Sequence, residues 1–353
     1  MKRPLVIGAV LALSVPLLGA PALAGENNKT CAPSATAVSF SDGLDKLVYD
    51  GATVGGLSDM AWDKRSGAWV SSVDNHASDP SRLWFWRDPA DPRVVRDPLV
   101  LRKPDGTAYD GTTADNEGLA VLPNGDFLVS SETEPSIRIF GRDGVQKSSL
   151  PVPARFAVAP AGEATANATL EGLTITPAGT RIVAAMEGAL SGDTDATLHR
   201  FLVYDLGRHG WSLTAQYAYR ADAGQRIPEV QAYDHDSLLV MEASFSTTTG
   251  NAVKLYAVPT TSHAVDVSKV TDLATAPSRV ILGKKLVADL VQCPTLGAPS
   301  RETQANPLLD NYEGMSVTPT SRGDVIHVIS DDNFGAAQFT RVLTLRSWLP
   351  NVW

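Results

Sequence analysis

The sequence has little cysteine and few long apolar segments, and both shortages limit what the protein can be. Its 353 residues include two cysteines, Cys31 and Cys293, so a cysteine-rich zinc site is excluded. Beyond the N-terminal 24 residues, no apolar run is long enough to predict a membrane span. In an oxidising compartment the two cysteines are expected to pair, and two free thiols are the alternative.

Positive charge is also in short supply. The chain has 30 Lys and Arg against 39 Asp and Glu, a formal net charge of −9. Such a chain is a poor candidate for binding nucleic acid, which depends on neutralising phosphates, and it suits cation binding better. Neither a Gly-x-Ser-x-Gly nucleophile motif nor a glycine-rich phosphate loop is present. Among the six histidines, His76 is retained as a possible general base.

The N-terminus has the pattern of a cleaved export signal. Lys2 and Arg3 precede an apolar core from Leu5 to Leu18, and Ala22-Leu23-Ala24 forms a small-residue cleavage site. The sequence therefore predicts a signal peptide over residues 1–24 and a secreted or periplasmic protein. Residues 25–35 are polar and are expected to be disordered. Residues 36–353 are expected to form one domain, and the protein to be a monomer.

A hairpin pattern covers Asn116 to Glu132. Apolar residues on both sides of Pro123-Asn124-Gly125-Asp126 predict two antiparallel strands joined by a tight turn. Glu117 opens the first strand and Glu132 closes the second. Since these two positions share one edge of an antiparallel pair, both carboxylates are expected at the end of the hairpin away from its turn.

The hairpin pattern recurs at Ser58, Glu171, Gln231 and Glu313. Strand pairs repeated every roughly 40 to 60 residues are typical of a β-propeller. The predicted fold is all-β, a propeller with five or six four-stranded blades. An N-terminal strand within Val38–Val48 is expected to close it. Residues 265–305 do not fit the repeat, and they are either a degenerate sixth blade or an inserted flap.

Acids recur at the same positions of the repeat. Because the first strand of each blade lines the central channel, acids at the starts of these strands are expected to converge at one mouth. Acids at the ends of the second strands form a second ring. The predicted metal ligands are Asp59, Glu117, Glu171 and Glu313 in the first ring and Asp74, Glu132, Glu187, Glu242 and Asp331 in the second.

So many like charges repel one another and need neutralisation. One remedy is a hard cation with oxygen ligands, and Ca²⁺ is the predicted cofactor. The other is pairing with the basic residues near the starts of the third strands, which would make a ladder holding the blades together. These residues are Arg82, Arg138, Arg200, Lys254 and Arg341. The glycines that follow the glutamates also have a simpler explanation, which is close approach of crowded inner strands.

An ordered series of short motifs resembles a known family. The motifs are Gly55-Gly56-Leu57-Ser58, Asn116-Glu117-Gly118-Leu119, Glu171-Gly172-Leu173, Arg226-Ile227-Pro228-Glu229-Val230-Gln231-Ala232, Asn311-Tyr312-Glu313-Gly314-Met315 and Ser330-Asp331-Asp332-Asn333-Phe334. Together they resemble the "esterase-like activity of phytase" family of secreted bacterial propeller proteins. The resemblance implies hydrolysis of phosphoesters or carboxylesters, and kinship with Ca²⁺-dependent propeller phytases that bind phosphate through metal ions.

The leading hypothesis is an exported, Ca²⁺-dependent hydrolase of small phosphoesters. Its predicted catalytic residues are Glu117, Glu171, Arg138, Arg200 and Lys254, of which the basic ones would stabilise developing negative charge. Two alternatives stay open. One is a non-catalytic propeller that binds a small ligand or a surface partner, since fold does not determine function. The other is a lactonase or carboxylesterase that uses the same metal site.

Overall fold

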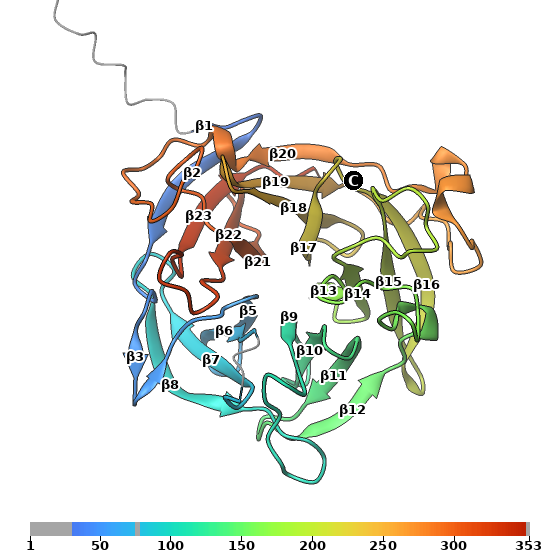
Figure 1. Ribbon diagram of the computed structural model, residues 1–353, viewed down its shortest axis with the longest axis horizontal. Coiled ribbons are helices and arrows are strands. Elements are labelled where there is room, and N and C mark those ends of the chain that lie inside the picture. Colours follow the sequence, from blue (N-terminus) through green and yellow to red (C-terminus); the bar gives the residue numbers. More distant parts are fainter. Residues whose placement is uncertain (1–29, 75–77, 351–353) are drawn as a thin grey trace, which may run out of the picture.

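Five antiparallel sheets surround a central axis in the computed structural model, which describes residues 30–74 and 78–350 (Figure 1). This arrangement confirms the predicted all-β propeller, with five blades. From the axis outward, the first two blades are β5 (Ala61–Asp63), β6 (Ala68–Ser72), β7 (Arg82–Arg87), β8 (Arg93–Val100); and β9 (Asn116–Val121), β10 (Phe127–Ser131), β11 (Ser136–Phe140), β12 (Gln146–Leu150).

The next two blades have the same order and longer outer strands. They are β13 (Leu170–Ile175), β14 (Arg181–Met186), β15 (Leu198–Gly207), β16 (Gly210–Arg220); and β17 (Arg226–Ala232), β18 (Leu238–Ser246), β19 (Gly250–Val258), β20 (Lys285–Asp289). A separate small hairpin, β3 (Val48–Tyr49) with β4 (Ala52–Thr53), precedes the first blade. Each of these four blades therefore has the four strands expected of a propeller blade.

The fifth blade closes the ring with the N-terminal part of the chain. It contains β21 (Tyr312–Thr318), β22 (Asp324–Ser330), β23 (Val342–Ser347), β2 (Ala35–Ser41) and β1 (Thr30–Cys31). Strand β2 pairs with β23 from Thr36 opposite Arg346 to Ser41 opposite Val342. The closing strand thus lies slightly earlier than the predicted Val38–Val48. A disulfide joins Cys31 to Cys293, as expected, and ties β1 to the segment after β20.

The predicted turn at residues 123–126 is formed as the sequence indicates. The Leu122 amide donates to the Asp126 carbonyl at 2.9 Å, and the Gly125 amide donates back to the Leu122 carbonyl at 2.7 Å. Gly125 has a φ of +85°, a region in which side chains are disfavoured. The turn places Glu117 and Glu132 at the opposite end of the hairpin.

A β-bulge interrupts the inner pair of strands where the predicted acids begin. In β9 the pairing moves from Asn116 opposite Ser131 to Leu119 opposite Val129, so Glu117 and Gly118 share one position of β10. The same irregularity occurs at the starts of β13, β17 and β21. Bulges bend a strand and change the direction of a side chain. Here they occur at the channel mouth in four of the five blades.

Apolar side chains fill the space between neighbouring blades. Phe85 of the first blade packs against Phe127 of the second with ring centroids 5.9 Å apart. Trp69 of the first blade packs against His327 of the fifth, with ring centroids 5.4 Å apart. These contacts between blades hold the inner strands around the axis.

Residues 265–305 do not form a sixth blade, so that alternative is wrong. The segment contributes β20, which is the fourth strand of the fourth blade. It also contains the short 3₁₀ helices Leu273–Thr275, Ser278–Val280 and Leu290–Gln292; a further one is Ala154–Phe156. Before β20 the chain packs on the outer strand of the third blade, where the Leu282 amide donates to the Ala218 carbonyl at 2.8 Å.

The N-terminal predictions fall mostly on residues outside the described part. The expected signal peptide, 1–24, lies there entirely. Of the segment 25–35, residues 30–35 are described, and they form β1 and the start of β2, which corrects the expectation of disorder for that part. Within the described residues, no helix has the length and apolar character needed to cross a membrane.

Candidate functional site at the acidic mouth of the channel

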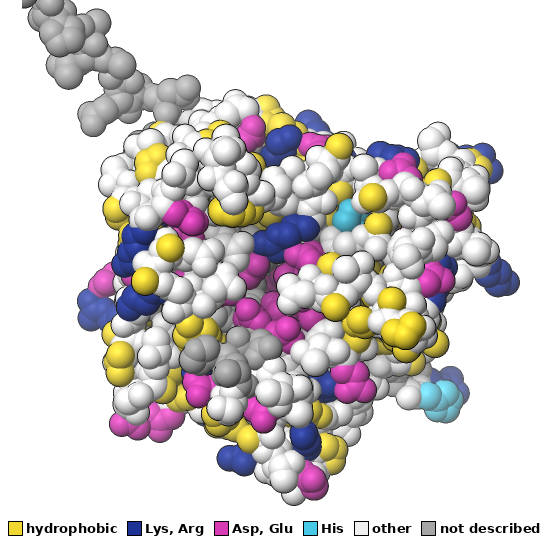
Figure 2. Space-filling model, in the orientation of Figure 1, with side chains coloured by type: hydrophobic (Ala, Val, Ile, Leu, Met, Phe, Trp, Pro, Cys, Tyr) yellow, Lys and Arg dark blue, Asp and Glu magenta, His cyan; other side chains and the backbone are white. Residues whose placement is uncertain are grey.

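The starts of the inner strands meet at one end of the central channel. Figure 2 shows acidic side chains gathered in a hollow at the middle of this face. We call this group the acidic mouth, and it consists of Asp74, Asp115, Glu117, Glu132, Glu171, Glu187, Glu313 and Asp331. Seven of these eight residues belong to the predicted rings, whereas Asp115 was not predicted.

The glycines after the mouth glutamates permit this convergence. A Cβ atom on Gly172 would lie 2.6 Å from the Val230 amide nitrogen, and one on Gly314 would lie 2.5 Å from the Asp59 Cα. A Cβ on Gly118 would overlap the Glu171 carbonyl oxygen. Each Glu-Gly pair therefore combines a carboxylate with the close backbone contact that brings the next inner strand near.

Arg226, at the start of β17, forms ion pairs with the mouth carboxylates. Its guanidinium donates to Glu187 at 2.8 Å and to Glu313 at 2.9 Å, and it lies 3.7 Å from Glu171. Asn311 accepts a further hydrogen bond at 2.8 Å. The surrounding carboxylates raise the pKa of Arg226 against the opposing effect of burial. The Arg226 guanidinium thus pairs with carboxylates from both the third and the fifth blades.

Two groups of three carboxylates lie close enough together to share a cation. One contains Glu117, Glu132 and Glu171, and the other contains Asp74, Asp115 and Glu117. Within each group, the nearest oxygens all lie within 4.8 Å of one another. The first three side chains are buried, and Oε2 of Glu171 accepts no hydrogen bond in the described structure. Hard oxygen ligands in this number suit Ca²⁺ or a similar divalent ion.

The pKa values of these groups reflect the crowding. Burial, and then the charges of Asp74 and Glu132, raise the pKa of Glu117 well above its ordinary value. Burial and then Glu117 do the same for Glu171. Burial and then Glu187 raise the pKa of Glu132 to about 7. A cation bound among these carboxylates would remove their mutual repulsion. The carboxylates would then release their protons more readily.

Glu187 and Asp331 are two further acids of the mouth. Burial raises the pKa of Glu187, and the charge of Arg226 opposes that rise. Burial and then Glu313 raise the pKa of Asp331 well above its ordinary value. Asp331 also accepts a hydrogen bond from the Asn333 amide at 2.7 Å, in the segment that follows β22. Both residues therefore belong to the same electrostatic unit as the three-glutamate group.

Asp59 lies deeper, paired with a residue that was not predicted. Its two oxygens accept hydrogen bonds from the amides of Met60 and Leu119, both at 2.6 Å. Glu229 of β17 faces it across the channel, and the two carboxyls interact directly. Burial raises the pKa of Asp59 to about 7, and it raises the pKa of Glu229 well above its ordinary value. A proton shared between them would leave the pair with a single negative charge.

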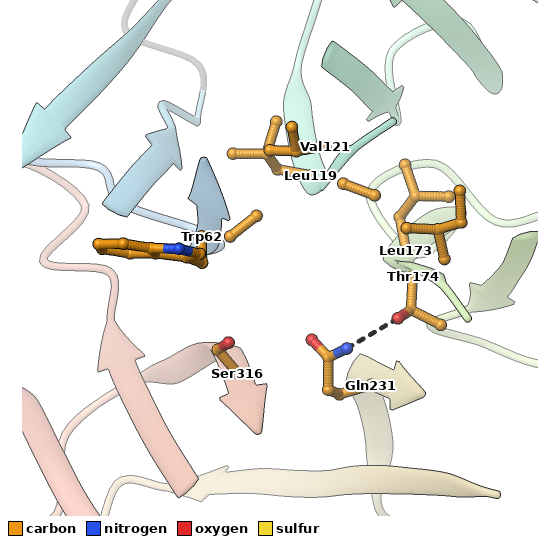
Figure 3. Close-up of a pocket in the computed structure, with 10 residues that line it drawn as sticks. Trp62, Leu119, Val121, Leu173, Thr174, Gln231 and Ser316 are labelled. Atoms are coloured by element: carbon orange, nitrogen blue, oxygen red, sulfur yellow. Dashed lines mark hydrogen bonds between the residues drawn. The ribbon is translucent and has the colours of Figure 1, made fainter. Parts of the chain in front are cut away.

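The opposite end of the channel has a different character. A cavity of about 120 Å³ lies where the inner strands finish, lined by Trp62, Thr174, Gln231, Ser316 and apolar neighbours (Figure 3). Gln231 donates to the Thr174 hydroxyl at 3.0 Å. No Asp, Glu, Lys or Arg is among its lining residues. The two ends of the channel therefore differ in charge, and the acids gather at one of them.

Glu242 and Lys254 belong to a separate network between the third and fourth blades. Glu242 is fully buried and accepts hydrogen bonds from Tyr219 at 2.6 Å and Lys284 at 2.5 Å. Lys254 pairs with Asp222 at 2.9 Å. Glu242 was predicted to join the second ring, but it pairs with Lys284 away from the mouth. The partner of Lys254, Asp222, also lies outside the mouth.

Arg200 and Arg138 also have local partners. All the donor nitrogens of Arg200 are engaged, with Asp193 at 2.7 and 2.8 Å, with Gln216, and with the carbonyls of residues 267 and 270. Arg138 pairs with Glu134 at 3.5 Å and lies over the Tyr109 ring. Neither of these two arginines forms an ion pair with a mouth carboxylate in the described part of the chain. The basic residue that joins the mouth acids is Arg226.

The predicted ladder of third-strand bases is likewise replaced by local ion pairs. Arg82 pairs with Asp79 at 3.6 Å, and Arg341 pairs with Asp42 at 2.7 Å. Position in the repeat had suggested the second-ring acids as partners. A signal for Arg226 was available, since it stands at the start of an inner strand, where other blades have an acid. His76 lies outside the described residues.

Comparison with known proteins identifies a family that matches this chain. The profile of the family described as "Phytase-like: Esterase-like activity of phytase" matches residues 52–334. This range holds every inner strand and every carboxylate of the acidic mouth. The search of curated proteins finds no significant match.

Solved structures with a similar chain path include proteins from three bacteria. A protein of unknown function from Dyadobacter fermentans is 12% identical with a TM-score of 0.47, covering 89% of this chain and 100% of that one. The periplasmic gluconolactonase of Pseudomonas aeruginosa is 12% identical with a TM-score of 0.37, covering 90% and 97%. A gluconolactonase from Xanthomonas campestris is 11% identical with a TM-score of 0.38, covering 90% and 91%. Similarity of this degree has no bearing on the activity of the chain.

Proposed function

The chain belongs to the phytase-like family described as esterase-like activity of phytase, and from this premise we propose that its acidic mouth hydrolyses ester bonds with a bound divalent cation. Phosphoesters are the proposed substrates, and Ca²⁺ is the proposed ion. The disulfide between Cys31 and Cys293 supports a location in an oxidising compartment, outside the cytoplasm.

The group of Glu117, Glu132 and Glu171 is the observation that carries this proposal. Three buried carboxylates from two adjacent blades lie within 4.8 Å of one another, and one buried oxygen of Glu171 has no hydrogen-bond donor. Each buried charged group that lacks a compensating partner destabilises the folded state by roughly several kcal/mol. A hard divalent cation among these oxygens would remove that cost and fit the ligand chemistry.

The glutamates of the mouth and Arg226 have separate tasks in this proposal. Glu117, Glu132 and Glu171 would hold the cation. When bound, the cation supplies positive charge that polarises the ester's phosphoryl oxygen. Arg226 keeps Glu187 and Glu313 in place, and its remaining donor capacity would orient an anionic ester at the rim. This assigns to Arg226 the role that position in the repeat had suggested for Arg138, Arg200 and Lys254.

Ester hydrolysis with and without cation tests the proposal. We expect the protein to hydrolyse bis-p-nitrophenyl phosphate or p-nitrophenyl phosphate with added Ca²⁺, and EDTA to abolish the activity. Glu171→Gln should lower kcat/KM by about 100-fold or more, since even residues behind a metal's direct ligands cost 10–100-fold. Glu134→Gln is the matched control, because the Glu134 side chain is 82% exposed.

Other outcomes decide between the alternatives. Activity that resists EDTA and persists in Glu117→Gln and Glu171→Gln would overturn the proposal. Turnover of p-nitrophenyl acetate or a lactone in place of the phosphates, with the same EDTA sensitivity, would keep the cation site and replace phosphoesters with carboxylesters. A melting temperature raised by Ca²⁺ with no turnover of any ester would identify a non-catalytic binding propeller.

A further inference from the structure

Two hollows adjoin each other at the end of the channel opposite the acidic mouth. The cavity of about 120 Å³ shown in Figure 3 and a groove of about 540 Å³ both have Trp62 and Ser316 among their lining residues. The groove lies between the first blade, which contributes Trp69, and the fifth, which contributes Pro319 and His327. We call the two hollows together the far depression. The volume of the groove is in the range of small-molecule pockets, roughly 300 to 1,000 Å³.

The far depression carries no charge among the described residues that line it. These include no Asp, Glu, Lys or Arg. The one titratable lining residue described, His327, is neutral at about pH 7, because burial lowers its pKa to about 4. A charged ligand would find no opposite charge here to offset the loss of its water. The depression therefore suits a neutral ligand.

Trp62 presents an exposed ring that is held in place. It is 48% exposed, and it packs edge-to-face against Trp69 with ring centroids 5.3 Å apart. Trp69 in turn stacks on the buried Trp86 at 6.0 Å, and the Trp86 indole donates to the Ser71 hydroxyl at 3.0 Å. A large ring that stays in water on a fixed support, beside a groove, marks a surface for a ligand.

Neutral polar groups without partners border the same depression. The side-chain amide of Gln231 donates to the Thr174 hydroxyl at 3.0 Å and to the Ala232 carbonyl at 2.9 Å. Because a carbonyl only accepts, these bonds determine the orientation of the amide, and its Oε1 accepts no hydrogen bond from the described residues. The Ser316 hydroxyl has no partner among those residues either. Figure 3 shows both side chains at the edge of the cavity.

We propose that the far depression binds a neutral sugar, with one face of the ring stacked on Trp62 and hydroxyls bonded to Gln231 and Ser316. A sugar ring carries C–H groups on its faces and hydroxyls around its edge. The C–H groups pack on the negative face of an indole. An amide oxygen and a hydroxyl then bond to the sugar hydroxyls and fix its orientation. This inference goes beyond the proposed hydrolysis, because it assigns a second site that needs no cation.

Saturation-transfer NMR on the full-length protein in EDTA tests the inference. The probes are methyl β-D-glucopyranoside, methyl β-D-galactopyranoside and N-acetylglucosamine. We expect transfer to the ring protons of at least one of them, since no cation takes part at this site. Glucuronate should give a weaker signal than the neutral glucoside, because its carboxylate has no partner in the depression. No transfer to any of the three neutral probes would overturn the inference.

Substitution of Trp62 locates the bound sugar. Trp62→Ala removes the stacking face and should weaken binding of the responding probe by about tenfold. Trp348→Ala is the matched control, because Trp348 is 73% exposed and is not among the described lining residues. It should bind the probe as the unchanged protein does. Equal affinities in the two variants would overturn the inference, and the measurement on the unchanged protein stands if a variant fails to fold.

Other occupants of the far depression give different results. Anilinonaphthalene sulfonate fluorescence that Trp62→Ala removes, with no response to any glycoside, would assign the depression to an apolar ligand and overturn the sugar. Glycoside binding that requires Ca²⁺ and is lost in Glu171→Gln, but not in Trp62→Ala, would place the sugar at the acidic mouth and overturn the far site as well. Neither result decides whether the mouth hydrolyses esters, so the two proposals can fail independently.

Discussion

The guanidinium of Arg226 lies 2.9 Å from the carboxylate of Glu313, although the two residues are 87 positions apart in the sequence. The fourth and fifth blades each contribute one of them from the start of an inner strand. The pair shows how the propeller neutralises part of its acidic mouth with one of its own side chains.

Replacing Arg226 should destabilise the fold when no cation is bound. Arg226→Met keeps the aliphatic stem but leaves Glu187 and Glu313 without their partner. Breaking a largely buried ion pair costs about 3 kcal/mol, so we expect a loss of that order in the free energy of unfolding, measured with urea in EDTA.

The exposed residue Arg322 provides the control for this experiment. Arg322→Met should stay within about 0.5 kcal/mol of the unchanged protein. Equal urea midpoints for the two variants would show that Arg226 does not compensate the mouth carboxylates.

Adding a methyl group at Gly172 should disturb the packing of the inner strands. The new Cβ would meet the backbone of Glu229 and Val230 at 2.6 to 2.9 Å, and backbone atoms cannot move aside as a flexible side chain can. We expect Gly172→Ala to lower the free energy of unfolding by about 1–3 kcal/mol, as overpacking does. In Gly283→Ala the Cβ would meet nothing within 4 Å. A similar loss in both variants would refute the close-approach explanation of the Glu-Gly pairs.

The Asp59–Glu229 pair should make the metal-free protein less stable as pH rises. Burial raises the pKa of Asp59 from 3.8 to about 7, so the folded state keeps a proton that the unfolded chain releases. This contribution is complete below pH 3.8 or so and is lost as pH rises through about 7. It is on the order of 2–4 kcal/mol.

Asp59→Asn isolates this effect, because the amide stays neutral at every pH. Unfolding by urea in EDTA at pH 5 and pH 8 should show a steeper fall in the free energy of unfolding for the unchanged protein than for the variant. Parallel pH profiles would contradict the shared proton.

The disulfide should contribute measurably to stability. It closes a loop across 262 positions, between β1 of the fifth blade and the segment after β20 of the fourth. Replacing both Cys31 and Cys293 by alanine should lower the free energy of unfolding by about 2–5 kcal/mol. Calorimetry of the double variant would check this, and an unchanged melting temperature would show that the pairing of β2 with β23 closes the ring without help.

The fold could be predicted because its signals are local. The turn at Pro123 to Asp126 and the apolar residues beside it specify a hairpin, and repetition of that hairpin specifies a propeller. The number of blades was less accessible. The fourth strand of the fourth blade, β20, comes after a long excursion from β19, and no local pattern marks residues 285–289 as belonging to it.

The sequence predicted most of the acids of the site, but it did not predict the basic residue that pairs with them. Glu117, Glu171 and Glu313 meet because each opens an inner strand, which is a property of the repeat. Arg200 stands at an equally regular position, yet it is buried against Asp193 at 2.7 Å. Asp115 and Glu229 escaped notice because neither follows the repeat.

The order of residues along this chain was sufficient to specify hairpins that all point the same way, and hence a propeller whose glutamates gather at one end. The basic side chain that pairs with those glutamates, Arg226, was decided by the three-dimensional packing of the blades. The reason is physical: hairpin formation depends on neighbours in sequence, whereas the energy of a charge depends on distances through space, and these exist only once the ring has closed.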